Sequence, residues 1–246
     1  MRRLALLPVF LLLCAALSAQ SVTVKDTVMR TYGYSDPDPV PRTGRIYPYH
    51  RYQSFALEGE DRIWKMVVLE NDFLRVKIFP QIGGKIWSVY DKKASRELFY
   101  DNPVVKFRDI SLRGPWTSGG IEFNYGIIGH APSCSSPVDY KVENKADGSV
   151  SCYIGVQELL TRTRWMVEIN LPKDAVWVRT RTFWHNYSGL QQPYYHWANS
   201  AVTASEDLNL VYPATYSIGH DGKTTPYPFD QGHDFSKYSD QKFGRD

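Results

Sequence analysis

Hydrophobic residues in the central part of this chain recur at every second position over short segments. Between positions 73 and 79, Leu74, Val76 and Ile78 alternate with basic residues, and Trp165–Leu171 repeats the pattern. Side chains two positions apart lie on the same face of a β-strand, so this spacing predicts strands with one buried face. No window of twelve or more residues shows the helical period of 3.6, and we therefore predict an all-β fold.

Turn sequences separate these segments at short intervals. Pro80-Gln81-Ile82-Gly83-Gly84 and Pro172-Lys173-Asp174 are both rich in residues that favour turns. The strands that we expect cover residues 63–69, 73–79, 85–90, 150–160, 165–171, 176–184 and 192–204. Many strands joined by short turns predict a β-sandwich or barrel, and the length of the chain fits one such domain.

The N-terminus has the order of a secretory signal peptide. The basic start Met1-Arg2-Arg3 precedes an apolar run over residues 4–17, and small residues surround a cleavage position after Ala19. This order predicts a signal peptide over residues 1–19 and a periplasmic or secreted mature chain. The alternative, a lipid anchor on Cys14, is disfavoured by the bulky residue before it. The apolar run is short for a membrane span, and no later segment is apolar enough to form one.

The remaining chain divides into an arm and a domain. Residues 20–50 are polar and contain the proline-rich run Asp36-Pro37-Asp38-Pro39, which predicts an extended N-terminal arm and not a packed element. Residues 51–246 form the predicted β-sandwich domain. Within it, Pro213–Asp246 lacks periodicity. We therefore expect a fragment of a longer chain, the alternative being a complete domain with a disordered tail.

Charge and cysteine content narrow the classes of function. The chain carries 29 basic and 26 acidic side chains, and loss of Arg2 and Arg3 with the signal peptide leaves a net charge near +1. A basic field that would attract nucleic acid is therefore absent. Cys134 and Cys152 stay in the mature chain. In an oxidising compartment they can form a disulfide or remain buried thiols, and the sequence leaves both open.

The segment around Glu122 contains the residue types that a sugar site needs. Glu122 and Asn124 share one face of an extended stretch that follows a glycine pair, Arg113 and Trp116 precede it, and His130 follows it. Aromatic rings stack on apolar sugar faces, while carboxylates and amides bind hydroxyl groups. We predict Glu122 and His130 as catalytic residues and the other three as substrate-binding residues. The alternative is a buried structural ion pair between Glu122 and Arg113 or another cation.

A second aromatic segment, residues 193–201, contains His196, Trp197 and Asn199. On a regular strand His196 faces one side and the other two face the opposite side, so all three reach one pocket only across a β-bulge. We predict His196 as a further catalytic candidate and Trp197 and Asn199 as substrate-binding residues. The alternative is a histidine of the core or rim. No motif has the ligand spacing of a known metal site, so the residues themselves predict no metal or cofactor.

The hairpin over residues 70–86, with the turn Pro80-Gln81-Ile82-Gly83-Gly84, resembles the opening hairpin of galactose-mutarotase-like domains. Leu112–Asn124 and Tyr194–Asn199 more closely resemble an uncharacterised subfamily, a domain of unknown function that precedes tetratricopeptide repeats in exported bacterial proteins, often near polysaccharide-utilisation genes. The similarity covers Ile63–Val211. It implies a galactose-mutarotase-like β-supersandwich, incomplete at the C-terminus, with a concave sugar-binding sheet and a downstream repeat domain in the full-length protein.

The resemblance also bears on activity. Epimerases of this superfamily use a histidine as acid and a glutamate as base. The His196 segment resembles the strand that carries this histidine, whereas the family's glutamate comes later than residue 246. Glu122 matches the Gly-Gly-Ile-Glu motif of the subfamily, whose role is not established. Some related hydrolases hold calcium in the groove, so the resemblance admits a calcium ion as cofactor.

Three functions follow, in this order. The first is a glycoside hydrolase acting on poly- or oligosaccharide, with Glu122 as general acid or base assisted by His130 or His196; it requires a second carboxylate near Glu122. The second is a non-catalytic glycan-binding module, with aromatic and amide side chains in a groove and Glu122 in an ion pair. The third is an aldose 1-epimerase, with a histidine and a glutamate facing each other across a small pocket.

Overall fold

The computed structural model describes residues 20–38, 40, 52, 54–109, 115–126, 130–219 and 221–241. The predicted signal peptide, residues 1–19, and the candidate Arg113 lie outside these ranges. The secondary structure is almost entirely β, which confirms the predicted all-β fold. The chain divides into two compact units, residues 1–200 and 201–246, where a single domain over 51–246 was predicted.

The first unit contains two sheets. The larger one has eight strands in the order β14-β9-β4-β3-β2-β1-β6, with β5 paired to β4. All its strand pairs are antiparallel except β1 with β6. The strands are β1 (Ser21–Tyr32), β2 (Glu60–Glu70), β3 (Leu74–Phe79), β4 (Lys85–Asp91), β5 (Arg96–Glu97), β6 (Val105–Lys106), β9 (Ile121–Tyr125) and β14 (His196–Ser200).

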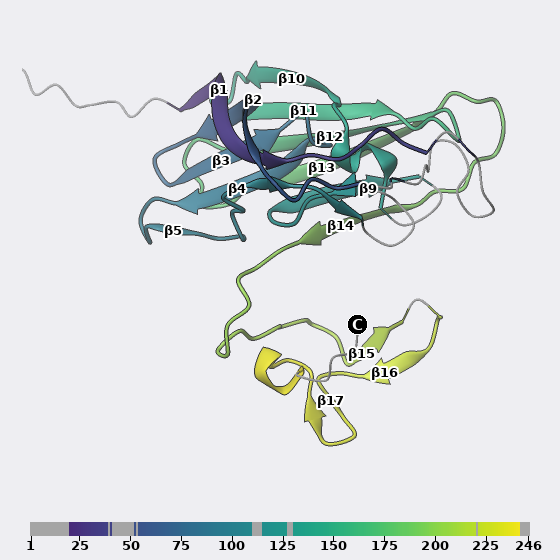
Figure 1. Cartoon of the computed structure of the whole chain (residues 1–246). Coiled ribbons are helices and arrows are strands. Elements are labelled where there is room, and N and C mark those ends of the chain that lie inside the picture. The colour runs from purple at the N-terminus through teal and green to yellow at the C-terminus, as the bar shows by residue number, and fades with distance from the viewer. Residues whose placement is uncertain are drawn as a thin grey trace, which may run out of the picture. The chain divides into compact units, whose positions relative to one another are not determined.

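Four antiparallel strands form the second sheet, in the order β10-β11-β12-β13. They are β10 (Asp139–Asn144), β11 (Val150–Gln157), β12 (Thr163–Leu171) and β13 (Arg179–Asn186); a two-stranded ribbon, β7 (Arg108–Asp109) with β8 (Pro115–Trp116), and a short 3-10 helix, η1 (Pro132–Ser135), complete the unit. Figure 1 shows the second sheet lying over one face of the larger sheet. The unit is therefore a β-sandwich.

The facing surfaces of the two sheets bury the alternating residues. Val76 and Ile78 of β3 pack in one cluster with Trp165 and Val167 of β12, and all four are at most 1% exposed. The predicted inner faces of these two strands are thereby confirmed. Burying each such side chain contributes about 2 kcal/mol, which makes this cluster the main source of stability of the unit. Cys152 belongs to this cluster, and Cys134 is buried as well, but the two cysteines are not bonded to each other.

The opposite face of the larger sheet carries a second apolar cluster. Phe79 of β3 and Trp87 of β4 lie in it with Val105 and Phe107, and the rings of Phe79 and Trp87 meet edge to face at 5.0 Å. The centre of this sheet is thus buried on both sides. The candidate site lies on the same face as Trp87, beyond β4 at the β9 and β14 edge.

The extended arm predicted over residues 20–50 is wrong for its first part. Ser21–Tyr32 form β1, which pairs with β2 along its whole length, from Ser21 opposite Glu70 to Thr31 opposite Glu60. Most β1 side chains between the two ends are exposed. This strand is therefore stabilised mainly by its backbone hydrogen bonds to β2. Such bonds do not require alternating hydrophobic residues, so the analysis of hydrophobic periodicity did not detect the strand.

The second unit, described by itself, consists of short ribbons. β15 (Tyr216–Ile218) pairs with β16 (Thr224–Pro226), β17 (Phe229–Asp230) pairs with β18 (His233–Asp234), and a 3-10 helix, η2 (Tyr238–Gln241), follows. None of its side chains whose burial is described is buried, which fits the missing periodicity of this segment. Over the described ranges, the structure contains no helix with the length and hydropathy needed to cross a bilayer.

Asn71, in the turn between β2 and β3, links the two sheets. Its Oδ1 accepts hydrogen bonds from the backbone N–H groups of Phe73 (2.9 Å) and Leu74 (2.7 Å). Its Nδ2 donates to the carbonyl oxygens of Pro172 (2.8 Å) and Ala175 (2.9 Å), in the turn after β12. The side chain is buried, so these four hydrogen bonds have no competition from water.

We expect Asn71→Ala to lower the free energy of unfolding by about 3 kcal/mol, because buried groups on both sheets lose their partners. Denaturant titration of the variant and the wild type measures this difference. Asn71→Asp is the matched variant, since it keeps the acceptor for the turn but loses both donors, and its loss should be intermediate. Wild-type stability of the alanine variant would contradict the linking role.

Candidate functional site

Strands β9 and β14 bring the two candidate segments together. In their antiparallel register Glu122 lies opposite Asn199, and Asn124 lies opposite Trp197. Residues that are directly opposite project to the same face of a sheet, so these four side chains share one face. The segments are 77 positions apart at the Glu122 and Asn199 pair, and only the pairing of the strands makes them neighbours.

The carboxylate of Glu122 is the centre of the site. Its Oε1 accepts hydrogen bonds from Asn124 Nδ2 at 2.7 Å and Asn199 Nδ2 at 3.4 Å, and also from His130 Nδ1. Its Oε2 accepts from the indole N–H of Trp116. Glu122 is 4% exposed, so the carboxylate lies below the surface with both oxygens engaged. We call these five residues the Glu122 cluster.

Aromatic rings surround this carboxylate. The imidazole of His130 lies edge to face against the ring of Trp197 at 4.8 Å and against that of Trp116 at 6.1 Å. The segment that carries His130 is anchored beside the cluster, because Asn124 Oδ1 accepts the backbone N–H of Ala131 at 2.8 Å. The three rings are partly exposed, so the buried carboxylate has an aromatic rim.

Lys85 lies beside the Glu122 cluster, although the sequence analysis did not select it as a site residue. It is 4% exposed, and its Nζ donates to the carbonyl oxygen of Thr117 at 2.5 Å. The ammonium group lies over the rings of Trp116, at 5.3 Å, and Trp87, at 5.9 Å. Lys85 begins the expected strand 85–90, and the sequence analysis assigns it no role in the site. The sequence did contain a hint, because Lys85 begins this strand two positions before Trp87, and the two side chains therefore project to the same face.

Burial and neighbouring charges act against each other at both ionisable groups, and the pKa of each group lies below its ordinary value. Burial lowers the pKa of Lys85 to about 8, an effect that the charge of Glu122 partly opposes. Burial alone would raise the pKa of Glu122. Hydrogen bonds from His130 and Asn124, with the charges of His130 and Lys85, outweigh it, so the pKa of Glu122 lies below its ordinary value. Glu122 is therefore ionised at neutral pH.

The ionised carboxylate determines the tautomer of His130. A carboxylate can only accept hydrogen bonds, so the hydrogen of this contact is on Nδ1 of the imidazole. In the neutral ring Nε2 is then the acceptor nitrogen. This arrangement can bind a hydroxyl donor of a ligand at Nε2, or take up a proton there.

The structure does not bring His196 to the Glu122 cluster. The β14 register is continuous, without the bulge that such a contact needs, and His196 projects to the opposite face. Its ring stacks on Tyr125 at 4.5 Å, and Tyr125 stacks in turn on Trp165 at 4.5 Å. His196 Nδ1 lies 3.2 Å from the carbonyl oxygen of Asn124. The prediction of His196 as a catalytic partner of Glu122 is therefore corrected to the alternative, a rim histidine.

Two further expectations concern charge partners of the site. Arg113 is outside the described residues, and within them the basic side chain that hydrogen-bonds Glu122 is His130. No second carboxylate joins the hydrogen bonds of Glu122 among the residues that the structure describes. Across the same ranges, no three His, Cys, Asp or Glu side chains lie close enough to hold a metal ion.

Fold and site together define a β-sandwich domain with a buried carboxylate inside a rim of aromatic and amide side chains. Residues 41–246 match the model of a family described as "Domain of unknown function (DUF5107)", and the chain belongs to this family. The predicted membership of an uncharacterised family is thus confirmed. The galactose-mutarotase-like superfamily is not established by this match.

A solved structure shares this fold. A TPR-domain containing protein from Parabacteroides distasonis ATCC 8503 superimposes on 78% of this chain with a TM-score of 0.73 and 24% sequence identity. The matched part is 34% of that protein, so this chain spans about a third of its length. At this identity the similarity concerns the fold alone.

Proposed function

We propose that this chain is a carbohydrate-binding domain of an exported bacterial protein, with a galactose-mutarotase-like sandwich fold. The observation that carries the proposal is the Glu122 cluster, in which one buried carboxylate orients amide, indole and imidazole groups at a partly exposed aromatic rim. A sugar ring would stack on the rim and bind the polar groups through its hydroxyls. The similarity to a TPR-domain containing protein supports the further proposal of a downstream repeat domain.

Two donors in the rim favour a ligand with hydroxyl oxygens. The indole Nε1 of Trp197 is buried and has no hydrogen-bond partner within the described structure. Asn199 Nδ2 makes only the long contact of 3.4 Å with Glu122. A buried donor without a partner costs free energy, so a ligand hydroxyl would satisfy the indole of Trp197 and would give Asn199 a closer acceptor.

Binding is favoured over hydrolysis by the state of Glu122. Both of its oxygens already accept hydrogen bonds, and in the described residues no second carboxylate joins the cluster. A glycoside hydrolase normally needs two carboxylates, about 5–5.5 Å apart for retention and about 6.5–9.5 Å apart for inversion. A non-catalytic binding module is expected to have Glu122 engaged by a basic side chain among aromatic and amide groups. The hydrogen-bonded carboxylate of Glu122 supports this expectation.

Glycoside hydrolysis is the second candidate, favoured by the hydrogen bond between Glu122 and His130. A carboxylate on Nδ1 orients the imidazole and fixes its tautomer, so Nε2 could act as a general acid or base. An epimerase is less favoured, because it needs the histidine and the glutamate on opposite sides of a substrate. Here the two side chains are in contact.

Glycan-array binding of the full chain, followed by a hydrolysis screen on the glycans that bind, tests both candidates. We expect Trp197→Ala to weaken binding at least 10-fold, because it removes a stacking surface and an unsatisfied donor. Trp177→Ala is the matched control, since Trp177 is a 46% exposed tryptophan of the connection before β13, and its binding should equal that of the wild type. Equal loss in both variants, or no glycan binding by the wild type, would contradict the proposal.

His130→Gln separates binding from catalysis. If the wild type hydrolyses a bound glycan and this variant retains binding without turnover, the hydrolase is correct. If neither protein hydrolyses any glycan that it binds, the binding module is correct.

A further inference from the structure

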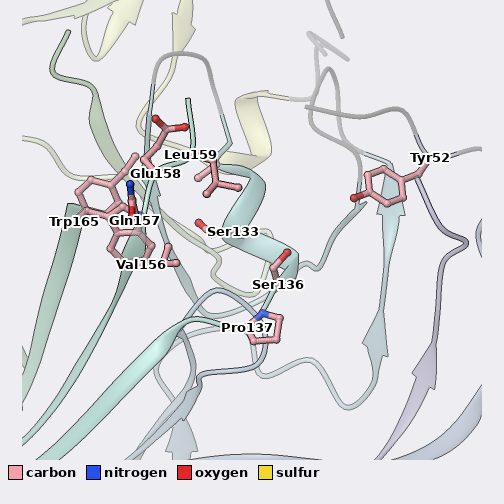
Figure 2. Close-up of a pocket in the computed structure, with 11 residues that line it drawn as sticks. Tyr52, Ser133, Ser136, Pro137, Val156, Gln157, Glu158, Leu159 and Trp165 are labelled. Carbon is pink, nitrogen blue, oxygen red and sulfur yellow. The ribbon is translucent and has the colours of Figure 1, made fainter. Parts of the chain in front are cut away.

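A cavity of about 260 Å³ lies between η1 and the turn that joins β11 to β12 (Figure 2). Glu122, Trp116 and Trp197 do not line it. It is therefore distinct from the Glu122 cluster, although Ala131 of its wall directly follows His130.

The floor of the cavity is apolar and aromatic. Tyr125 and Trp165 line it with their rings stacked at 4.5 Å and nearly parallel, at an interplanar angle of 7°. Both are buried. Val156 and Leu159 add aliphatic surface, and Figure 2 shows Val156 beside Trp165. Because Trp165 and His196 cover the two faces of the Tyr125 ring, Tyr125 contributes its edge, and the floor offers general apolar contact to a ligand ring.

The remaining wall supplies neutral polar groups. Ser133 and Ser136 contribute from η1 and the residue after it, Gln157 from the end of β11, and Tyr52 from a separate segment that stands apart in Figure 2. Hydroxyl, amide and phenol groups both donate and accept hydrogen bonds, whereas ammonium and carboxylate groups do only one. These groups can hydrogen-bond the hydroxyl groups of a ligand, but none of them carries a charge that would pair with an ionic ligand.

Glu158 is the acidic residue of the lining, but its carboxylate is committed elsewhere. It accepts hydrogen bonds from the backbone N–H groups of Leu160 (3.1 Å) and Thr161 (2.6 Å), and from the hydroxyl of Thr161 (2.5 Å). These bonds close the turn after β11. No Lys, Arg or His lies among the described lining residues, so a neutral ligand is favoured over an ionic one.

Hydrogen bonds also hold both walls in place. On the η1 side the N–H of Gly83 donates to the carbonyl oxygen of Ser136 at 2.8 Å, and a Cβ on Gly83 would lie 2.7 Å from the carbonyl oxygen of Ser133. On the other side the N–H of Glu158 donates to the carbonyl oxygen of Thr163 at 2.7 Å. Because the walls are rigid, the cavity is formed before any ligand enters, which lowers the entropic cost of binding.

We infer that this cavity is a second ligand site, which binds one small neutral ring with peripheral hydroxyl groups, of the size of a monosaccharide. Its volume is slightly below the usual range of about 300–1,000 Å³ for ligand pockets, so it accommodates a single ring and not an oligosaccharide. The inference rests on the lining of the cavity itself and does not depend on the Glu122 cluster.

Calorimetric titration of the full chain with glucose, galactose, mannose and myo-inositol tests the inference, with benzene as a purely apolar probe. Two variants block the cavity: Ser133→Phe fills it, and Leu159→Trp covers it from a side chain that is 52% exposed and therefore tolerates enlargement. Trp197→Ala removes the other site. We expect one of the polyhydroxylated rings to bind the wild type and Trp197→Ala alike, and Leu159→Trp at least 10-fold more weakly.

Each outcome has one meaning. Binding that Leu159→Trp and Ser133→Phe leave unchanged, while Trp197→Ala abolishes it, would overturn the second site but support the proposed carbohydrate site. Binding of benzene without any polyhydroxylated ring would overturn the ligand class. Absence of binding by all probes would also overturn the inference. Near-ultraviolet circular dichroism verifies that Leu159→Trp is folded, so its result stands if Ser133→Phe does not fold.

Discussion

Gly120→Ala is expected to lower the free energy of unfolding of the first unit by about 4 kcal/mol, a large part of the roughly 5–15 kcal/mol that stabilises an ordinary domain. Gly120 has a φ of +60°, a conformation that side chains with a Cβ rarely adopt. A Cβ at this position would overlap the carbonyl oxygen of Ile86 and lie 3.0 Å from that of Trp87. β4 cannot move away, because Ile86 pairs with Ile121, and Ile86 and Trp87 each belong to one of the two buried clusters.

Gly189→Ala is the matched control for this substitution. Gly189 has a φ of +69°, but nothing lies within 4 Å of the position that its Cβ would take. Gly189→Ala should therefore lower the free energy of unfolding only through the cost of a left-handed backbone conformation, about 1–2 kcal/mol. Denaturant unfolding of both variants separates the two effects. Similar losses at the two positions would show that contact with β4 contributes nothing.

The inner faces of the sandwich were predictable from the sequence because burial and strand geometry act locally. Leu74, Val76 and Ile78 alternate, and all three are buried. The same reasoning failed for Ser21–Tyr32, which is a strand because its backbone pairs with β2 and not because one of its faces is apolar. A strand without a buried face has no periodic signal for a single sequence to reveal.

The candidate site was predictable residue by residue but not as an arrangement. Alternation correctly separated His196 from Trp197 and Asn199, because it depends only on the geometry of one strand. The contact of Asn199 with Glu122 depends on the register between β14 and β9, which tertiary packing determines. Lys85 was missed for a related reason: strand geometry places Lys85 and Trp87 on one face, but the apolar cluster that buries this face is assembled from distant segments.

Glu122→Gln is expected to lower the free energy of unfolding by about 3 kcal/mol at neutral pH and to abolish glycan binding. Removing the charge of a buried carboxylate weakens the hydrogen bonds that it accepts, and a hydrogen bond to a charged group contributes about 1.5–3 kcal/mol. The glutamine amide also directs an NH₂ group at a donor, because His130, Asn124 and Trp116 all donate to the carboxylate. Lys85 in addition loses the charge that opposes the lowering of its pKa.

Glu168→Gln is the matched variant, because Glu168 is a buried carboxylate of the second sheet. It accepts hydrogen bonds from Lys145, from Ser151 at 2.9 Å and from Tyr153 at 3.2 Å. We expect it to lose stability as well but to bind glycans like the wild type. If both variants lose binding equally, loss of folding and not loss of the site explains the effect, and the role assigned to Glu122 is wrong.

The pH dependence of stability provides an independent readout for Glu122. Its pKa in the folded chain lies below the ordinary value of 4.5, so the unfolded chain binds more protons at acidic pH. The stabilisation from this group is therefore fully present above its unfolded pKa and is lost as pH falls through the lower folded pKa. Glu122→Gln has no such group, so between about pH 5 and pH 2 its stability should fall less steeply than that of the wild type. Urea titrations across this range measure both slopes, and parallel slopes would mean that folding does not lower the pKa of the Glu122 carboxyl, which would remove the electrostatic basis of the site.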